Sequence, residues 1–178
     1  MELEYRVLDE HSPGLDEVCF LFETAFPPEE RPPFDLAISW KNSSFNGIYH
    51  DGEFVALADL VEYQDYLYVF FLAVKEEKRN QGIGAQILSD LKKKYADKTL
   101  FLLADEVGEE YEDNPLRLRR VYFYERNGFH HNGIHIKEFE VMYQMQVCGT
   151  KEVDKRVFLS TMERLIGPEM MKKLYSDV

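Results

Sequence analysis

The sequence predicts an α+β fold with a single mixed, mostly antiparallel central sheet flanked by helices. Short apolar runs with the spacing of strands are interleaved with stretches whose apolar residues recur at helical intervals. Between residues 66 and 104 a strand, a helix and a strand follow one another, an order typical of a parallel pair with a right-handed crossover. The chain has 178 residues, 45% of them hydrophobic, which suits one domain with its own core.

The first part of the chain predicts a short strand and two helices. The strand covers Glu4–Leu8. Ser12 is a suitable N-cap, and a proline with helically spaced apolar residues follows it, so we expect a helix over Pro13–Ala25. Four prolines within residues 27–33 end this helix, because proline lacks an N–H and fixes φ. A short second helix is expected around residues 34–40.

The middle of the chain predicts a meander of antiparallel strands. They cover Phe45–His50, Glu53–Val61 and Tyr66–Val74. The first two are separated by Asp51-Gly52, a dipeptide that favours a hairpin turn in which both residues have positive φ.

The following segments alternate between helix and strand. They are a helix over Gly82–Tyr95, a strand over Thr99–Ala104, a helix over Pro115–Asn127 and strands over Phe129–Ile136 and Glu138–Val147. Beyond Gly149 a helical stripe of apolar residues returns. We therefore divide the chain into a domain of residues 1–149 and a C-terminal helical extension of residues 150–178. The apolar stripe must be covered, either by the domain itself or by a partner subunit in a homodimer.

Charge excludes some classes of partner. The chain has 21 basic and 33 acidic residues, a net charge of -12, and a pI near 4.9. Nucleic acid is therefore not an expected partner, whereas a cationic substrate would be attracted. An anionic ligand must be held locally, by oriented backbone amides or a few arginines. The N-terminus has no signal-peptide pattern and no apolar run approaches the ~20 residues that span a bilayer, so we expect a cytoplasmic protein without a membrane partner.

No metal site is expected. The two cysteines, Cys19 and Cys148, have no paired spacing with histidines, and Cys19 reads as a buried free thiol in an apolar run. The five histidines also lack the spacing of metal ligands and are interpreted as surface or ordinary sheet residues.

One loop carries a pattern suited to anion binding. The strand that ends at Val74 is followed by Arg79-Asn80-Gln81-Gly82-Ile83-Gly84-Ala85, which leads directly into a helix. Glycines leave the backbone accessible at a helix start, where N–H groups lack partners and the dipole is positive, so a pyrophosphate could be held there. No Lys-Ser/Thr follows, which excludes a P-loop, and residue 87 is Ile rather than the third glycine of a dinucleotide fingerprint. A tight turn packed on the sheet is the structural alternative.

A second signal is Val121-Tyr122-Phe123-Tyr124-Glu125-Arg126-Asn127-Gly128-Phe129, which ends a helix at a glycine and starts a strand. Together with Arg79-x-x-Gly82-x-Gly84, it resembles the GNAT superfamily of N-acetyltransferases. The resemblance covers about Phe45 to Val147 and implies the acyl-CoA N-acyltransferase fold, with acetyl-CoA as co-substrate.

The resemblance also assigns residues. It implies that the main chain of Leu72, Ala73 and Val74 lines the pantetheine arm. It implies that the pyrophosphate is held by amides of the segment that we call the cofactor loop, Arg79, Asn80, Gln81, Gly82, Ile83, Gly84 and Ala85. Tyr124 occupies the place of a tyrosine that lies close to the thioester sulfur in the family. Arg117 stands where the family often has an asparagine, so a pantetheine contact from that helix is not expected.

The implied reaction moves an acetyl group to a primary amine of a small molecule or peptide by direct attack on the thioester. A lysine-like amine has a pKa of ~10.4, so a base must accept its proton. Glu62, Asp105 and Glu106 are candidates, and we select Glu106 because it follows the strand beside the cofactor strand. Two alternatives are a GNAT-like module that binds CoA without turnover and an acyltransferase that uses another acyl group. The acidic residues between 106 and 113 are interpreted as a solvated loop, with attraction of a cationic substrate as the functional alternative.

Overall fold

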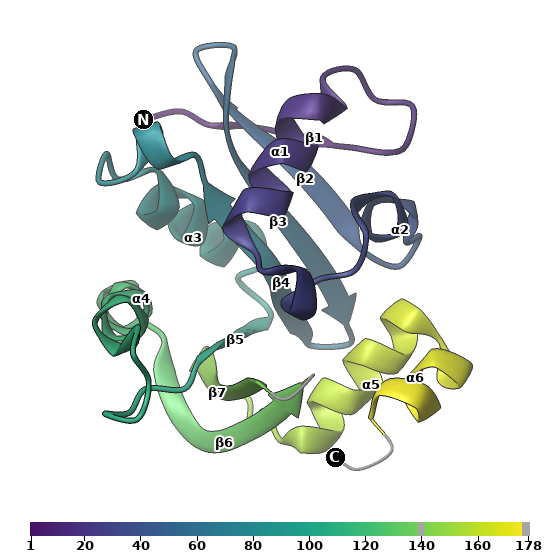
Figure 1. Ribbon diagram of the computed structural model, residues 1–178, viewed down its shortest axis with the longest axis vertical. Helices are drawn as coiled ribbons and strands as arrows, with labels where there is room; N and C mark the ends of the chain where they lie inside the picture. The colour runs from purple at the N-terminus through teal and green to yellow at the C-terminus, as the bar shows by residue number, and fades with distance from the viewer. Residues whose placement is uncertain (139–140, 176–178) are drawn as a thin grey trace. The chain divides into compact units, whose positions relative to one another are not determined.

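A computed structural model describes residues 1–138 and 141–175. The chain divides into two compact units. The N-terminal unit comprises residues 1–62 and 69–96, and the C-terminal unit comprises residues 63–68 and 97 onward. Each unit is described by itself (Figure 1).

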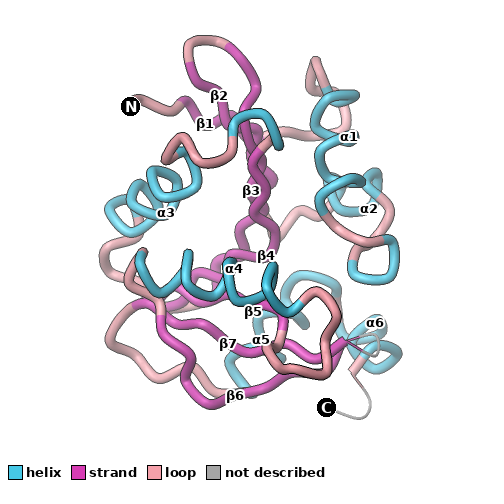
Figure 2. The backbone as a smooth tube through the Cα atoms, turned by 60° about the vertical axis from the view of Figure 1, so that its left-hand side comes forward, coloured by secondary structure: helices cyan, strands magenta, loops and turns pink. Residues whose placement is uncertain are grey.

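The N-terminal unit contains an antiparallel arrangement of strands with helices on both sides. Its elements are β1 (Glu4–Val7), α1 (Leu15–Ala25), the 3-10 helix η1 (Pro28–Glu30), α2 (Phe34–Ser39), β2 (Ser44–His50), β3 (Glu53–Tyr63), most of β4 (Tyr66–Val74), the 3-10 helix η2 (Glu76–Lys78) and α3 (Ile83–Lys94). Strands β1 and β2 pair antiparallel, as do β2 and β3. Figure 2 shows α3 on one side of β3, and α1 with α2 on the other.

An aromatic core lies under α1. The Phe22 side chain is fully buried, and its ring centroid lies 5.9 Å from that of Phe45 on β2 and 4.9 Å from that of Phe71 on β4. Val18 and Leu21 of α1 and Ala73 of β4 belong to the same cluster. The helical stripe that the sequence predicts therefore fixes the position of α1 against the end of β4.

The predicted start of α1 is wrong. The helix begins at Leu15, with Gly14 as its N-cap at φ 76°, rather than at Pro13 after Ser12. The Ser12 hydroxyl instead accepts a hydrogen bond from the Asp9 amide at 2.9 Å and donates one to the Asp9 carboxylate. The serine is used to close a turn, because a short hydroxyl side chain satisfies nearby backbone groups as readily as it caps a helix.

The predicted hairpin between β2 and β3 is confirmed. Asp51 has φ 51° and Gly52 has φ 79°, so both turn residues are in the left-handed region, as this turn requires. Strand β3 continues to Tyr63, two residues beyond the predicted end, and Gln64 then takes a positive φ of 49° in the next turn.

A carboxylate is buried within β3. Asp59 is 0% exposed and lies opposite Phe45 of β2. Burial raises its pKa to about 7. The Ser43 hydroxyl and the Leu60 main chain act in the opposite direction. Within the described part of the chain, however, neither carboxylate oxygen has a partner in regular hydrogen-bond geometry.

The C-terminal unit is built on a second group of strands. It contains the first residues of β4, then β5 (Thr99–Asp105), α4 (Asn114–Arg126), β6 (His130–Glu138), β7 (Val141–Cys148), α5 (Lys155–Ile166) and α6 (Pro168–Leu174). The start of β4 pairs parallel with β5, which confirms the predicted parallel pair. Strand β7 pairs antiparallel with both β5 and β6, so it lies between them. Figure 1 shows α4 at one side of these strands and α5 with α6 at the other.

The boundary between the last two strands differs from the prediction. Glu138 ends β6 instead of beginning the next strand, which starts at Val141. The predicted strand boundary at residue 137 is therefore wrong, and residues 139–140 lie outside the described range. Residues 137–140 contain no Gly, Pro, Asn or Asp, so the sequence has no signal that marks where the first strand ends.

The C-terminal extension packs on strands of its own unit. The Asp154 side chain caps α5 by accepting from the Val157 amide at 3.0 Å. The fully buried Phe158 ring contacts Tyr68 of β4 and Tyr175, with centroid distances of 5.9 and 5.8 Å. The domain boundary at residue 149 and the homodimer both remain predictions.

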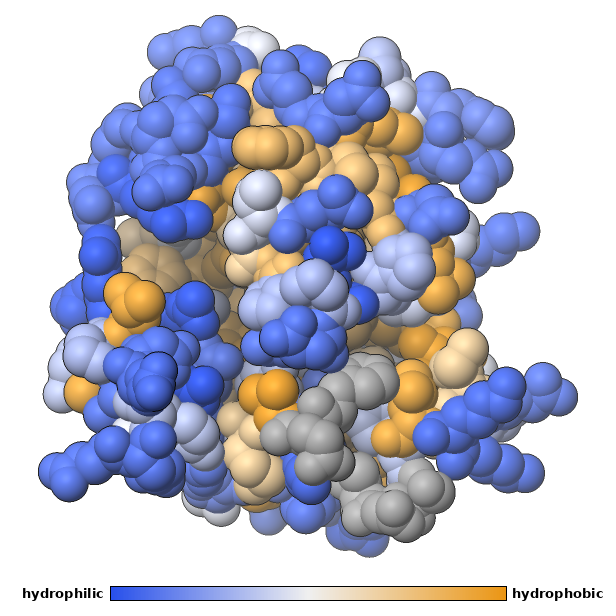
Figure 3. Space-filling model, viewed as in Figure 1, coloured by the Kyte–Doolittle hydropathy of each residue, from blue (hydrophilic) through white to orange (hydrophobic). Residues whose placement is uncertain are grey.

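The hydrogen-bonded order of the strands is β1-β2-β3-β4-β5-β7-β6, with β4 shared by the two units. The predicted α+β class, with a mixed and mostly antiparallel sheet flanked by helices, is confirmed. Among the described residues no helix combines the length and apolar character that crossing a membrane requires. Figure 3 shows mainly hydrophilic side chains on one face, with apolar patches between them.

Candidate active site

The cofactor loop ends at a helix start whose amides are available. Gly82 is the N-cap of α3, and no side chain caps this end. The Gln86 amide donates to the Gly82 carbonyl at 2.9 Å as the first bond of the helix. The amides of residues 83–85 therefore precede the intrahelical ladder, and the positive end of the helix dipole lies beside them.

Position 82 requires glycine because of its backbone conformation, and the space in front of it is open. Its φ of 83° lies in the left-handed region, where a side chain is strained. A Cβ placed on it would meet no atom within 4 Å. Residues 79–82 are all exposed, so this part of the loop is not packed against the sheet. The space in front of the loop is therefore open at Gly82.

Side chains of the loop brace its backbone. The Arg79 Nε donates to the Val74 carbonyl at 3.2 Å, which ties the loop to the end of β4. The Gln81 amide group donates to the Glu77 carbonyl at 2.9 Å. At the end of β4, Ala73 belongs to the core under α1.

Tyr124 lies on α4 in the C-terminal unit. Its half-buried ring packs on Phe123 and Phe129, with centroids 5.3 and 6.0 Å away. Burial raises its pKa to about 12, and the Arg120 charge opposes this while the Asp105 charge adds to it. Within residues 1–138 and 141–175 the Tyr124 hydroxyl has no hydrogen-bond partner, so a neutral donor is available to a ligand.

Glu106 directly follows β5 and is held by several groups. The Tyr111 hydroxyl donates to one carboxylate oxygen at 2.8 Å, and His135 Nδ1 lies 2.7 Å from the other. The Glu106 amide donates to the Met142 carbonyl at 3.1 Å. The carboxylate is only 24% exposed, so its position is fixed by β6, β7 and the segment before α4.

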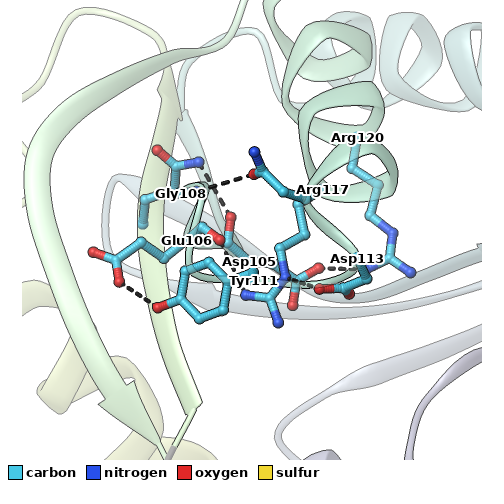
Figure 4. Close-up of polar contacts among 9 residues, drawn as sticks. Asp105, Glu106, Gly108, Tyr111, Asp113, Arg117 and Arg120 are labelled. Atoms are coloured by element: carbon cyan, nitrogen blue, oxygen red, sulfur yellow. Dashed lines mark hydrogen bonds and ion pairs between the residues drawn. The ribbon is translucent and has the colours of Figure 1, made fainter.

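Arg117 organises the segment between β5 and α4 (Figure 4). Its Nε donates to the Asp113 carboxylate at 2.6 Å, and Nη1 donates to the Glu106 carbonyl at 3.0 Å. The guanidinium lies 4.0 Å from the centre of the Tyr111 ring. The arginine that replaces the family's asparagine therefore has a structural function here. Of the acidic residues in this segment, Glu109, Glu110 and Glu112 are exposed, as expected for a solvated loop.

The remaining base candidates lie in different surroundings. Asp105 forms an ion pair with Arg120 on α4, and its side chain is 11% exposed. Glu62 is exposed at the end of β3, where it helps to raise the pKa of Tyr95. Glu62 and the cofactor loop thus belong to the N-terminal unit, and Asp105, Glu106 and Tyr124 belong to the C-terminal unit.

Sequence reasoning missed two residues of the Glu106 cluster, Tyr111 and His135. Tyr111 is part of the acidic segment that reads as a solvated loop. His135 is 29 positions from Glu106 and meets it only because β7 inserts between β5 and β6. No local pattern in the sequence could have predicted this contact.

Comparisons with known proteins identify the family of this chain. Residues 41–131 match the family model "Acetyltransferase (GNAT) domain". The chain is 30% identical over 123 residues to "Putative acetyltransferase YjbC" of Bacillus subtilis (strain 168), a match that covers 66% of this chain but only 57% of that relative.

Solved structures have the same fold at lower identity. A GNAT-family protein from Bacteroides thetaiotaomicron superposes with a TM-score of 0.72 and 20% identity, covering 90% of this chain and 94% of that one. A GNAT acetyltransferase from Elizabethkingia anophelis, solved with acetyl-CoA bound, has a TM-score of 0.57 and 16% identity, over 83% and 98% of the two chains. Because the family model spans half of the sequence and includes both the cofactor loop and Tyr124, this chain belongs to the GNAT family of acetyltransferases.

Proposed function

We propose that the protein is an acetyl-CoA-dependent N-acetyltransferase that moves an acetyl group to a primary amine of a small molecule or peptide. The observation that carries the proposal is the uncapped start of α3 behind the exposed cofactor loop, in a chain of the GNAT family. A pyrophosphate needs oriented N–H donors, and the backbone of this loop would supply them, since the Nε of its basic residue, Arg79, donates to the Val74 carbonyl. The acetyl-CoA bound to the Elizabethkingia relative supports the same donor here.

The donor would be held mainly by backbone. The amides of Arg79 through Ala85 take the pyrophosphate, and the main chain of Leu72, Ala73 and Val74 takes the pantetheine arm. The overall charge of -12 opposes an anionic nucleotide, so local dipoles must supply the attraction. The same charge favours an acceptor that carries a protonated amine.

The chemistry requires three functions. A base must accept the proton that the amine loses, and Glu106, which the sequence selects, is the candidate at the end of β5 for this function, directly or through a neighbouring group. A backbone N–H near Val74 stabilises the oxyanion of the tetrahedral intermediate. Tyr124 donates a hydrogen bond to the departing thiolate. Its pKa of about 12 keeps the phenol protonated at neutral pH, so it acts as a donor throughout the reaction.

Two measurements on the purified chain test the proposal. Isothermal calorimetry with acetyl-CoA should give saturable binding, and a free-thiol assay over a panel of polyamines, aminoglycosides and lysine peptides should show CoA release with at least one amine. Binding without release for any amine would favour a CoA-binding module. Release with propionyl-CoA or succinyl-CoA but not with acetyl-CoA would favour another acyl group. Absence of binding would contradict the proposal altogether.

A further inference from the structure

His135 and Glu106 form a carboxylate and imidazole pair in the C-terminal unit. His135 lies on β6 and Glu106 follows β5, and His135 Nδ1 is 2.7 Å from a Glu106 carboxylate oxygen. Nδ1 is buried although the side chain is 40% exposed. The exposed part of the His135 side chain therefore lies away from Nδ1.

The carboxylate is fixed before any substrate arrives. Tyr111 donates to its other oxygen, and the Glu106 main chain is held by the Met142 carbonyl and by Arg117. A group held in this way is suited to orienting a neighbour. The contact with Nδ1 lies outside regular hydrogen-bond angles, and it becomes an ion pair only when the ring carries a second proton.

The arrangement selects one tautomer of the neutral ring. A carboxylate facing Nδ1 favours a proton on that nitrogen, which leaves the lone pair on Nε2. The same logic operates wherever a buried carboxylate orients a histidine that accepts a proton and then stabilises the imidazolium. Two further titratable groups among the described residues lie near this ring: Tyr111, through Glu106, and His131, whose ring centroid is 5.0 Å away.

We propose that His135 is the general base of the acetyl transfer and that Glu106 is its positioning residue; this rests on the proposed function. Nε2 takes one proton from the acceptor ammonium, which leaves a neutral amine and an imidazolium. The amine lone pair forms a bond to the thioester carbonyl carbon, and the C–S bond breaks. The second amine proton passes to the thiolate, so the products are the amide, free CoA and the proton on His135, which is then lost to water.

The first test is His135→Ala, with His130→Ala as the matched control. His130 is an exposed histidine of the same strand and lies outside the pair. With the amine and acetyl-CoA that the wild-type chain uses, His135→Ala should lower kcat/KM about 100-fold, which is typical for loss of a general base. The acid limb of its pH profile should disappear, and added imidazole should restore part of the rate. His130→Ala should stay within about twofold of wild type.

The second test is Glu106→Gln, which keeps an acceptor for Tyr111 but removes the charge. If Glu106 positions His135, Glu106→Gln should lower kcat but keep the acid limb, while the KM for the amine changes little. If Glu106 is itself the base, Glu106→Gln should abolish the limb and His135→Ala should keep it, which would overturn the inference.

The two proposals fail in distinguishable ways. A wild-type chain that transfers no acetyl group to any amine would end the proposed function and this inference together. A wild-type chain that does transfer, with a His135→Ala variant that retains its rate and acid limb, would end the inference alone. Acetyl-CoA affinity measured by calorimetry verifies that each variant is folded, and His135→Gln is a second substitution if His135→Ala does not fold.

Discussion

Asp59 makes the stability of the N-terminal unit depend on pH in a way that Asp59→Asn should remove. The folded state holds this carboxyl with a pKa of about 7, whereas an unfolded aspartate has a pKa of ~3.9. Below pH ~4 both states are protonated, so the group has no effect on stability. As the pH rises from ~4 to ~7, the unfolded state releases its proton before the folded state does, and stability falls.

The size of the effect follows from the two pKa values. A difference of ~3 units at about 1.4 kcal/mol per unit gives a loss of about 4 kcal/mol between pH 4 and 7, with a plateau above. Against a typical unfolding free energy of about 5–15 kcal/mol, this is a large fraction. The cause is desolvation, since a charge at 0% exposure without a regular hydrogen bond is costly.

The measurement is urea unfolding between pH 4.5 and 8.5, followed by the fluorescence of Trp40, the single tryptophan. Trp40 stacks on Phe70 at 6.0 Å between ring centroids within the N-terminal unit, so it reports on the unit that contains Asp59. Asp51→Asn, an exposed carboxylate in the β2–β3 turn, is the control for removal of one charge.

The decisive quantity is the slope of the unfolding free energy with pH. Asp59→Asn introduces a buried amide, whose own cost of about 1–3 kcal/mol does not vary with pH. Wild type and Asp51→Asn should lose stability in parallel as the pH rises, and Asp59→Asn should lose much less. If the slopes of wild type and Asp59→Asn coincide, the assignment of the raised pKa to Asp59 is refuted.

Three further predictions concern the candidate site. Tyr124→Phe should lower kcat ~10-fold or more, because it removes a hydrogen bond to a charged group, and acetyl-CoA affinity should be unchanged. Equal turnover of the two proteins in the thiol assay would remove Tyr124 from the mechanism. Gly82→Ala should weaken acetyl-CoA binding ~10-fold in calorimetry and reduce the unfolding free energy by about 1–2 kcal/mol, because alanine is strained at positive φ; an unchanged affinity would contradict the cofactor loop. Arg117→Lys should speed amide hydrogen exchange in residues 106–113, because lysine lacks the fork that joins Asp113 to the Glu106 carbonyl; unchanged exchange would refute the organising function of Arg117.

Local signals in the sequence predicted much of the fold, including the helix start that follows the cofactor loop. The Asp51-Gly52 turn, the apolar stripe of α3 and the glycine after α4 each act within a few residues, and all three are present in the structure. Signals that allow two local uses were less reliable. Ser12 closes a turn instead of capping α1, since a hydroxyl can satisfy either set of backbone groups.

The cofactor loop illustrates what the sequence by itself determined. Its glycines, its place after an apolar strand and the helix that follows are consecutive in the chain, so a glycine loop before a helix start could be predicted from spacing alone, and its use as an anion cradle stays a prediction. The family resemblance had the same local basis, because both motifs are short runs of residues.

Only the tertiary structure decided the surroundings of the acidic groups. Asp59 reads as one polar residue in a strand, and its burial depends on packing against other segments of the N-terminal unit. Glu106 follows β5 and His135 lies on β6, and the two side chains meet across β7, which lies between these strands. No periodicity in the sequence encodes this strand order. A carboxylate's chemistry depends on its solvent and its neighbours, and both are set by contacts between residues far apart in the sequence.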